Sequence, residues 1–193
     1  MGRDRASRPE AKPLRLFVAV DVPAEVRAAV AEAVAPIREG HPRARWVPLE
    51  NQHVTVKFLG RTWPRLTDWV PERVREVAAE VAPFTTRVAG VGAFPSPRRA
   101  RVLWAGLEDP DGRLAVMAGA LDRAMSAEFE PEKRAFTPHL TVARFQPPVA
   151  VEEIGAGAEM GEPFPVDRLI LYRSHLRRPA PVYEALRVFP LAG

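Results

Sequence analysis

The sequence predicts an α+β fold. Stretches that alternate in the manner of strands are mixed with stretches that have helical periodicity, and the connections between them are short. No glycine pattern of the Rossmann or Walker type is present. The chain has 193 residues, of which 47% are hydrophobic and 27% charged, as in ordinary globular proteins. We therefore expect a single compact domain over residues 14–193.

The first quarter of this domain is predicted to contain three strands and a helix. Apolar residues alternate at 14–21 among strong strand formers, which indicates a strand. Pro23 then opens a helix whose apolar residues recur every three or four positions as far as Gly40. A short strand is expected at 44–47, and a stronger one at 52–59 follows turn-forming residues.

Two helices and two strands are predicted for the middle of the chain. Valines at helical spacing indicate a helix at 70–81. Strands at 84–93 and 101–107 are joined by a loop rich in proline and arginine. Leucines and methionines at helical spacing then predict a helix over 111–129.

Strands dominate the last part. The first, at 139–145, precedes a segment at 146–163 that is rich in Pro, Gly and Ala, for which we predict mostly loop. Strands at 164–172 and 182–189 complete the domain. The order of strands and helices also suggests an internal duplication that would set two equivalent strands side by side.

Composition limits the location and the chemistry. Residues 1–13 are polar and basic, and we expect a disordered tail rather than a signal peptide or anchor. No stretch approaches the roughly 20 apolar residues of a membrane span. The absence of cysteine excludes thiol nucleophiles and Cys-ligated zinc and agrees with a cytoplasmic location.

The charge balance favours anionic partners. The 28 Lys and Arg residues exceed the 24 Asp and Glu residues, which gives a net charge of +4. Nearly all of the cations are arginine, whose guanidinium matches phosphate geometry. An arginine-rich composition can equally reflect genome composition or growth temperature, so a phosphate ligand does not follow from charge alone.

A His-x-Thr triplet occurs twice, as His53-Val54-Thr55 and His139-Leu140-Thr141, both on predicted strands. Residues i and i+2 of a strand share a face, so each His and its Thr should face one cleft. Opening a cyclic phosphodiester needs one base and one acid, and two imidazoles can divide these roles near neutral pH. The Thr hydroxyls can donate hydrogen bonds to phosphate oxygens, where charge grows in the transition state.

These residues have other interpretations. A lone His on a strand is most often a half-buried structural side chain, and only the repetition argues against this here. A zinc site would need further donors, and the sequence has no HExxH pattern and no obvious neighbouring carboxylate. A Thr nucleophile is poorly placed, because each Thr is fixed beside its own His. His41 and His175 are expected at the surface.

With these motifs the sequence resembles the 2H phosphoesterase superfamily, specifically the RNA 2',3'-cyclic phosphodiesterases that are also described as 2'-5' RNA ligases. The resemblance spans residues 14–191 and rests on an ordered set of segments. These are RLFVAVDVP, HVTVKFLG, GAFPSP followed by RVLWAGL, FTPHLTVAR, and FPL near the end.

The resemblance implies a bilobal fold in which two antiparallel sheets face a central groove, with helices outside. It also implies a reaction without metal or other cofactor. His53 would be the proton donor to the leaving 3' oxygen and His139 the proton acceptor that activates water, leaving a 2'-phosphomonoester. Thr55 and Thr141 would hold the phosphate. Nothing in the local sequence separates the two histidines.

Three further residues are candidates. Arg144 matches an arginine that follows the second motif in this family, although strict alternation puts it on the opposite face from His139, so it needs a bulge or a strand end to reach the groove. Phe17 matches an aromatic residue that can stack on the base; a place in the core is the alternative. Lys57 shares the predicted face of His53 and would add positive potential or be solvated, whereas Phe58 should anchor the strand in the core.

The expected substrate is RNA with a 2',3'-cyclic phosphate end, for which tRNA fragments are a candidate source; DNA is excluded because it lacks the 2'-OH. The same site run in reverse would act as a 2'-5' ligase. The alternatives are a phosphodiesterase for small cyclic nucleotides or 2'-5' oligonucleotides, and a binding module that recognises such ends without turnover. We expect a monomer.

Overall fold

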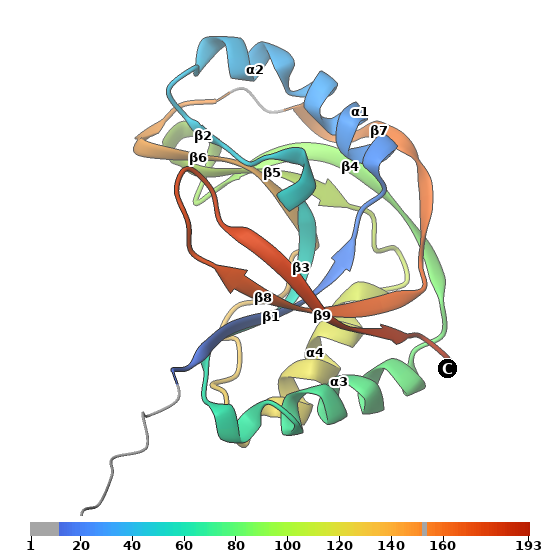
Figure 1. Cartoon of the computed structure of the whole chain (residues 1–193). Helices are drawn as coiled ribbons and strands as arrows, with labels where there is room; N and C mark the ends of the chain where they lie inside the picture. Colours follow the sequence, from blue (N-terminus) through green and yellow to red (C-terminus); the bar gives the residue numbers. More distant parts are fainter. Residues whose placement is uncertain (1–11, 152–153) are drawn as a thin grey trace, which may run out of the picture.

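The computed structural model describes residues 12–151 and 154–193 (Figure 1). The predicted tail at 1–13 therefore falls almost entirely outside the described residues. The helices are α1 (Ala24–Ala33), α2 (Ala35–Gly40), α3 (Trp69–Glu80) and α4 (Arg113–Met125). The strands are β1 (Leu14–Asp21), β2 (Arg45–Trp46), β3 (His53–Thr62), β4 (Phe84–Phe94), β5 (Ala100–Leu107), β6 (His139–Val149), β7 (Ile154–Val166), β8 (Arg168–His175) and β9 (Val182–Pro190).

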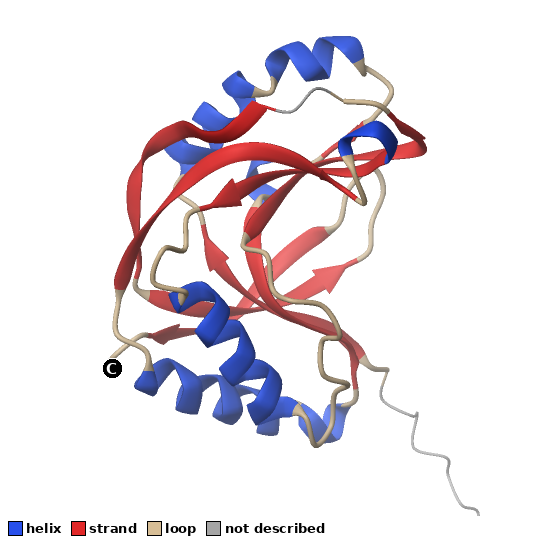
Figure 2. Cartoon of the chain, turned by 180° about the vertical axis from the view of Figure 1, so that it is seen from behind, coloured by secondary structure: helices blue, strands red, loops and turns tan. Residues whose placement is uncertain are grey.

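The strands of the described residues form one curled antiparallel sheet in the order β7-β4-β5-β6-β3-β1-β8-β9, with β2 paired to β6. Between β3 and β6 the register contains a single pair, Val54 with Leu140, so the sheet divides there into two halves. Helices α1 and α2 cover the half that contains β7, and α3 and α4 cover the half that contains β3 and β8 (Figures 1 and 2). The predicted α+β fold is confirmed, and the two expected sheets are joined at this pair.

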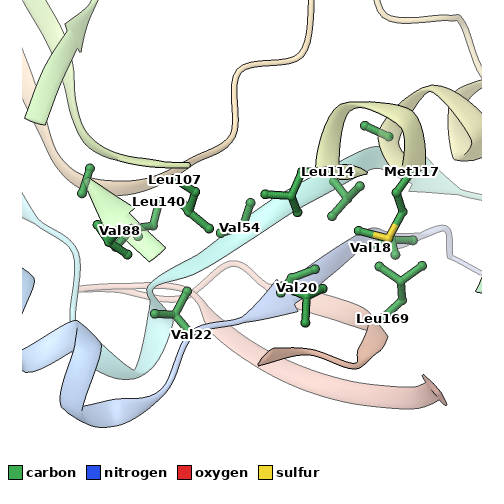
Figure 3. Close-up of a cluster of buried hydrophobic side chains, with 14 of the residues drawn as sticks. Val18, Val20, Val22, Val54, Val88, Leu107, Leu114, Met117, Leu140 and Leu169 are labelled. Atoms are coloured by element: carbon green, nitrogen blue, oxygen red, sulfur yellow. The ribbon is translucent and has the colours of Figure 1, made fainter. Parts of the chain in front are cut away.

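One hydrophobic core serves both halves. Val18 and Val20 of β1 lie with Val54 of β3 near Leu114 and Met117 of α4, and Val88, Leu107 and Leu140 extend the cluster into the other half (Figure 3). The apolar positions of α4 recur at helical spacing and are buried. The Asp109 carboxylate accepts hydrogen bonds from the backbone N–H groups of Leu114 and Ala115 at 2.9 and 3.0 Å, which caps this helix.

No helix of the described residues combines the length and the apolar character that a membrane span requires.

The prediction of a loop at 146–163 is wrong. Strand β6 continues to Val149, and β7 begins at Ile154 and pairs with β4 as far as Val166. The β4–β7 pairing contains register shifts, and beside them Gly161 has a positive φ of 74°, a backbone conformation that glycine adopts without strain. An added Cβ at Gly161 would lie 3.1 Å from the Cα of Val26, so its small size also lets α1 pack closely.

Two other predicted elements are each divided in the structure. The predicted strand at 164–172 is divided at Asp167, because Phe164–Val166 completes β7 and Arg168 begins β8. The predicted helix at 23–40 is interrupted at Val34, so it forms α1 and α2.

A β-bulge in β3 changes which residues face the groove. Thr55 pairs with Ala19 and Lys57 pairs with Val18, so Val56 is an extra residue on β3. The alternation of faces therefore reverses after Val56. Lys57 is buried at 2% exposure instead of sharing the face of His53, and Phe58 is 45% exposed instead of lying in the core. Both predictions assumed unbroken alternation, and both are wrong.

Lys57 of β3 forms a buried ion pair with α4, the helix that covers this half of the sheet. Its ammonium contacts the carboxylate of Asp122 on α4 and donates a hydrogen bond to the carbonyl of Glu130 at 3.2 Å. Asp122 also accepts a hydrogen bond from the backbone N–H of Glu132 at 3.1 Å. Burial raises the pKa of the Asp122 carboxyl, but the hydrogen bonds from Lys57 and from the Glu132 N–H, together with the charges of Lys57 and Arg123, outweigh burial and lower this pKa. The pair thus fixes the segment that leads toward His139.

Removal of Asp122 is expected to destabilise the protein. Asp122→Ala leaves the Lys57 ammonium buried and unpaired, and the free energy of unfolding should fall by about 3–5 kcal/mol in urea titrations. The double variant Lys57→Met with Asp122→Ala removes the unpaired charge and should recover part of this loss. An Asp122→Ala variant as stable as wild type would contradict the structural role of the pair.

Candidate active site

The two His-x-Thr motifs lie together because β3 and β6 are neighbours. His53 and His139 are the first residues of these strands, and the Val54–Leu140 pair brings the strands together directly beside both histidines. His53, Thr55, His139 and Thr141 all line one groove of about 1020 Å³. The structure thus brings together the four residues that the sequence analysis assigned to one cleft.

Each imidazole is oriented by the same backbone contact. The Nδ1 atom of His53 lies 2.9 Å from the carbonyl oxygen of Asn51, and Nδ1 of His139 lies 2.7 Å from that of Thr137. In both motifs the acceptor is the residue two positions before the histidine. A carbonyl can only accept, so Nδ1 carries the hydrogen and Nε2 is left for chemistry. In His53, Nε2 accepts a hydrogen bond from the Thr55 hydroxyl at 3.0 Å.

Both imidazoles are packed among aromatic rings. The ring centroids of His53 and Phe17 are 4.7 Å apart in a stacked arrangement, and those of His53 and Tyr183 are 5.1 Å apart in an edge-to-face arrangement. His139 is contacted edge-on by Phe94 at 5.2 Å. These rings cover part of each imidazole and hold its plane in place.

Burial favours the neutral form of both histidines. It lowers the pKa of His53 from 6.5 to about 4, against the opposing effects of the Asn51 hydrogen bond and the Asp21 carboxylate. Burial also lowers the pKa of His139, and the nearby Arg144 guanidinium lowers it further. In the substrate-free protein both imidazoles are therefore neutral at neutral pH, and a bound anion is needed to stabilise an imidazolium.

The lowered pKa of His53 predicts a loss of stability in mild acid. Between about pH 4 and 6.5 the unfolded chain binds a proton at His53 that the folded chain does not bind, so the free energy of unfolding falls as the pH is lowered through this window. Urea titrations of wild type and His53→Asn at about pH 7 and pH 5 test this, with His175→Ala as a control that keeps both groove histidines. An equal pH dependence in all three proteins would contradict it.

Arg144 reaches the groove through a second bulge. Leu103 pairs with Ala143 and Trp104 pairs with Thr141, so Val142 is an extra residue on β6. Arg144 is therefore exposed and lines the groove on the same side as His139. Of the two alternatives expected for Arg144, a bulge or a strand end, the structure has the bulge. The extra residues Val142 and Val56 each lie three positions after the histidine of their motif. This equal spacing agrees with the suggested duplication.

Arginine is the only charged residue type among the groove-lining residues of the described chain. Six arginines line the groove and no Asp or Glu does: Arg15, Arg38, Arg45, Arg144, Arg177 and Arg178. Such a surface attracts phosphate groups and raises their local concentration. Neither His41 nor His175 is part of this lining.

Phe17 is only 3% exposed, lies among His53, Tyr172 and Tyr183, and also lines the groove. This burial favours the alternative of a place in the core, and stacking of Phe17 on a base stays a prediction. The exposed aromatic ring at the groove belongs to Phe58, with the Arg15 guanidinium 4.8 Å from its centroid. The sequence analysis missed Phe58 because a bulge has no signature of its own in the alternation of β3.

The alternative of a zinc site finds no donor set in the described residues. Within residues 12–151 and 154–193 no group of three or more His, Cys, Asp or Glu side chains is arranged to hold a metal ion. A reaction without metal stays a prediction for experiment.

The fold and the groove define an acid–base site for a phosphate ester. Two imidazoles present Nε2 to a groove that also offers hydroxyls and guanidinium groups, which are the groups that can transfer protons and hold phosphate oxygens.

Comparison with known proteins also indicates a phosphoesterase. The model of the LigT-like phosphoesterase family matches residues 20–104 and 107–183. A protein of Thermus thermophilus named RNA 2',3'-cyclic phosphodiesterase is 36% identical to this chain, over 93% of this chain and 91% of the relative. A protein of the same name from Methanothermobacter thermautotrophicus is 32% identical, over 92% of this chain and 99% of the relative. A relative of that name from Geobacillus stearothermophilus is 30% identical over 92% of this chain, which spans 57% of that relative.

Solved structures show the same likeness. A protein of Thermus thermophilus superposes with a TM-score of 0.81 at 31% identity, over 93% of this chain and 99% of that one. Escherichia coli LigT complexed with 3'-AMP superposes with a TM-score of 0.72 at 26% identity, over 94% and 100%. The chain belongs to the LigT-like phosphoesterase family and is an enzyme of this class.

Proposed function

We propose that this protein hydrolyses the 2',3'-cyclic phosphate at the 3' end of RNA and leaves a 2'-phosphomonoester. The observation that carries the proposal is the pair of imidazoles that share one groove and are held in the same tautomer by equivalent backbone carbonyls. The names of the relatives point to the same substrate.

His139 acts as the base. Its Nε2 takes a proton from water while the water oxygen attacks phosphorus, so a new P–O bond forms. The Arg144 guanidinium favours the neutral form of His139, which is the form a base requires. The same guanidinium is placed to pair with the phosphate oxygens, whose charge grows during attack.

His53 acts as the acid. As the bond between phosphorus and O3' breaks, the Nε2–H of protonated His53 gives its proton to O3', which leaves as a hydroxyl. Because the pKa of His53 is about 4 in the substrate-free protein, the anionic substrate must stabilise the imidazolium. The Asp21 carboxylate also raises the pKa of His53, whereas it has no such effect on the pKa of His139. This difference supports the division of roles.

The remaining groups bind the substrate. The hydroxyls of Thr55 and Thr141 donate to the phosphate oxygens, and the exposed ring of Phe58 offers a stacking surface for the terminal base. Attack by a 5'-hydroxyl in place of water, with the same cleavage of the bond between phosphorus and O3' and protonation of O3', would give a 2'-5' linkage. A cytoplasmic location, a monomeric state and tRNA fragments as a source of substrate remain predictions.

Incubation of the protein with EDTA and an oligoribonucleotide that ends in a 2',3'-cyclic phosphate tests the proposal. We expect a 2'-phosphate product, identified by its resistance to an enzyme that removes only 3'-phosphates. Activity that requires added metal would overturn the two-histidine mechanism. Tight binding of this end without turnover would indicate the binding module. Turnover of cyclic mononucleotides or 2'-5' oligonucleotides alone would indicate the small-molecule alternative.

A further inference from the structure

Strand β2 adds a second arginine beside Arg144. In the β2–β6 pairing Arg45 stands directly opposite Arg144, and Trp46 stands opposite Ala143. Directly opposite residues of an antiparallel pair have Cα atoms about 4.5–5.5 Å apart, and like charges in such positions repel. Both arginines are exposed and both line the groove.

Within the described residues nothing neutralises this pair. Neither Arg45 nor Arg144 forms an ion pair there, and no carboxylate lines the groove. Two other groove arginines lie over aromatic rings, Arg15 over Phe58 at 4.8 Å and Arg38 over Trp46 at 5.7 Å. An anion bound by the guanidinium groups of both Arg45 and Arg144 would relieve the repulsion between them.

The position of Arg45 fits a second phosphate rather than the reacting one. Strand β6 pairs with β3 at Leu140, beside the histidines, and with Arg45 at Arg144. Arg144 belongs to the motif strand β6 itself, whereas Arg45 lies one strand farther out, about 5 Å away across the β2–β6 pairing. An anion held by Arg45 can therefore be the next phosphate of the chain, beyond the one that Arg144 contacts.

We propose that Arg45 binds the internucleotide phosphate on the 5' side of the terminal nucleotide, so that the preferred substrate is at least a dinucleotide with a cyclic phosphate end. This inference rests on the proposed function and selects within it an oligonucleotide over a cyclic mononucleotide. The edge of β2 is then a specificity element, because a mononucleotide has no phosphate at this position.

The test compares two substrates that share the reacting group. Wild type, Arg45→Gln and Arg75→Gln are assayed on a cyclic mononucleotide and on a dinucleotide that ends in the same cyclic nucleotide. Arg75 is exposed on α3 away from the groove, so its variant controls for the loss of one positive charge. Arg45→Gln should lower kcat/KM on the dinucleotide about tenfold, chiefly by raising KM, and leave the mononucleotide within about twofold of wild type.

A dinucleotide whose internucleotide linkage is a neutral methylphosphonate sharpens the test. Wild type should lose about the same tenfold on this substrate, and Arg45→Gln should lose nothing further, because the two changes remove one interaction. The role of Arg45 would be overturned if Arg45→Gln lost activity equally on the mononucleotide and the dinucleotide, or lost none on either. It would also be overturned if the losses from Arg45→Gln and from the methylphosphonate were additive. In these cases the proposed function would still stand. A wild-type protein that turns over none of these substrates would overturn the proposed function and the inference with it.

Discussion

His139→Ala is expected to lower kcat/KM on a cyclic-phosphate RNA end by about 10²–10⁴-fold, and His53→Ala by a similar factor. Each variant removes one of two proton transfers that a positioned imidazole accelerates to this extent. His175→Ala is the matched control, because His175 lies outside the groove and forms its hydrogen bond with Glu184 at 2.7 Å. Initial rates with the three variants measure the effect.

The pH dependence of the residual activity separates the two roles. Wild type should show a bell-shaped profile whose limbs belong to the coupled pair. His139→Ala should lose the acidic limb, since the base is no longer titrated, and His53→Ala should lose the alkaline limb, since the acid is absent. The opposite pattern would exchange the roles, and activity near the wild-type level in either variant would contradict the two-histidine mechanism.

The position of the four motif residues in one groove could be predicted from the sequence because their signal is local. Each motif places a His and a Thr on one face of a strand by spacing alone, and the repetition distinguishes the pair from a structural histidine. The carbonyl contacts of Asn51 and Thr137 are also local, since each lies two residues before its histidine. They escaped the sequence analysis because backbone groups leave no residue signature.

The residues around the reacting groups depend on non-local structure. The bulges at Val56 and Val142 arise from pairing with β1 and β5, which the alternation of one strand cannot reveal. For this reason Lys57 and Phe58 were assigned to the wrong faces. At Arg144 the sequence analysis expected either a bulge or a strand end, because alternation alone put this residue on the opposite face from His139.

The segment at 146–163 shows the same limit at the level of the fold. Its Pro and Gly content is typical of loops, but β4 provides a partner along its edge, and this tertiary pairing outweighs local preference. The register shifts between β4 and β7 are where such residues are tolerated. A single sequence contains no information about which edge is available.

Arg144→Gln is expected to lower kcat/KM on a cyclic-phosphate end by about 10²-fold, because it removes a charged donor from the position where negative charge grows. Arg144→Lys should fall between this variant and wild type, since lysine keeps the charge but loses the planar fork that matches two phosphate oxygens. Arg75→Gln again controls for net charge. A lysine variant as impaired as the glutamine variant would assign the effect to geometry alone.

A second readout links Arg144 to the base. The guanidinium lowers the pKa of His139, so its removal should raise this pKa and shift the acidic limb of the pH profile toward higher pH. Titration of the imidazole resonances by NMR in the substrate-free protein measures the same shift without turnover. If the resonances of His139 titrate identically in wild type and Arg144→Gln while activity is lost, Arg144 acts on the phosphate only. If activity is retained, Arg144 does not contact the reacting phosphate.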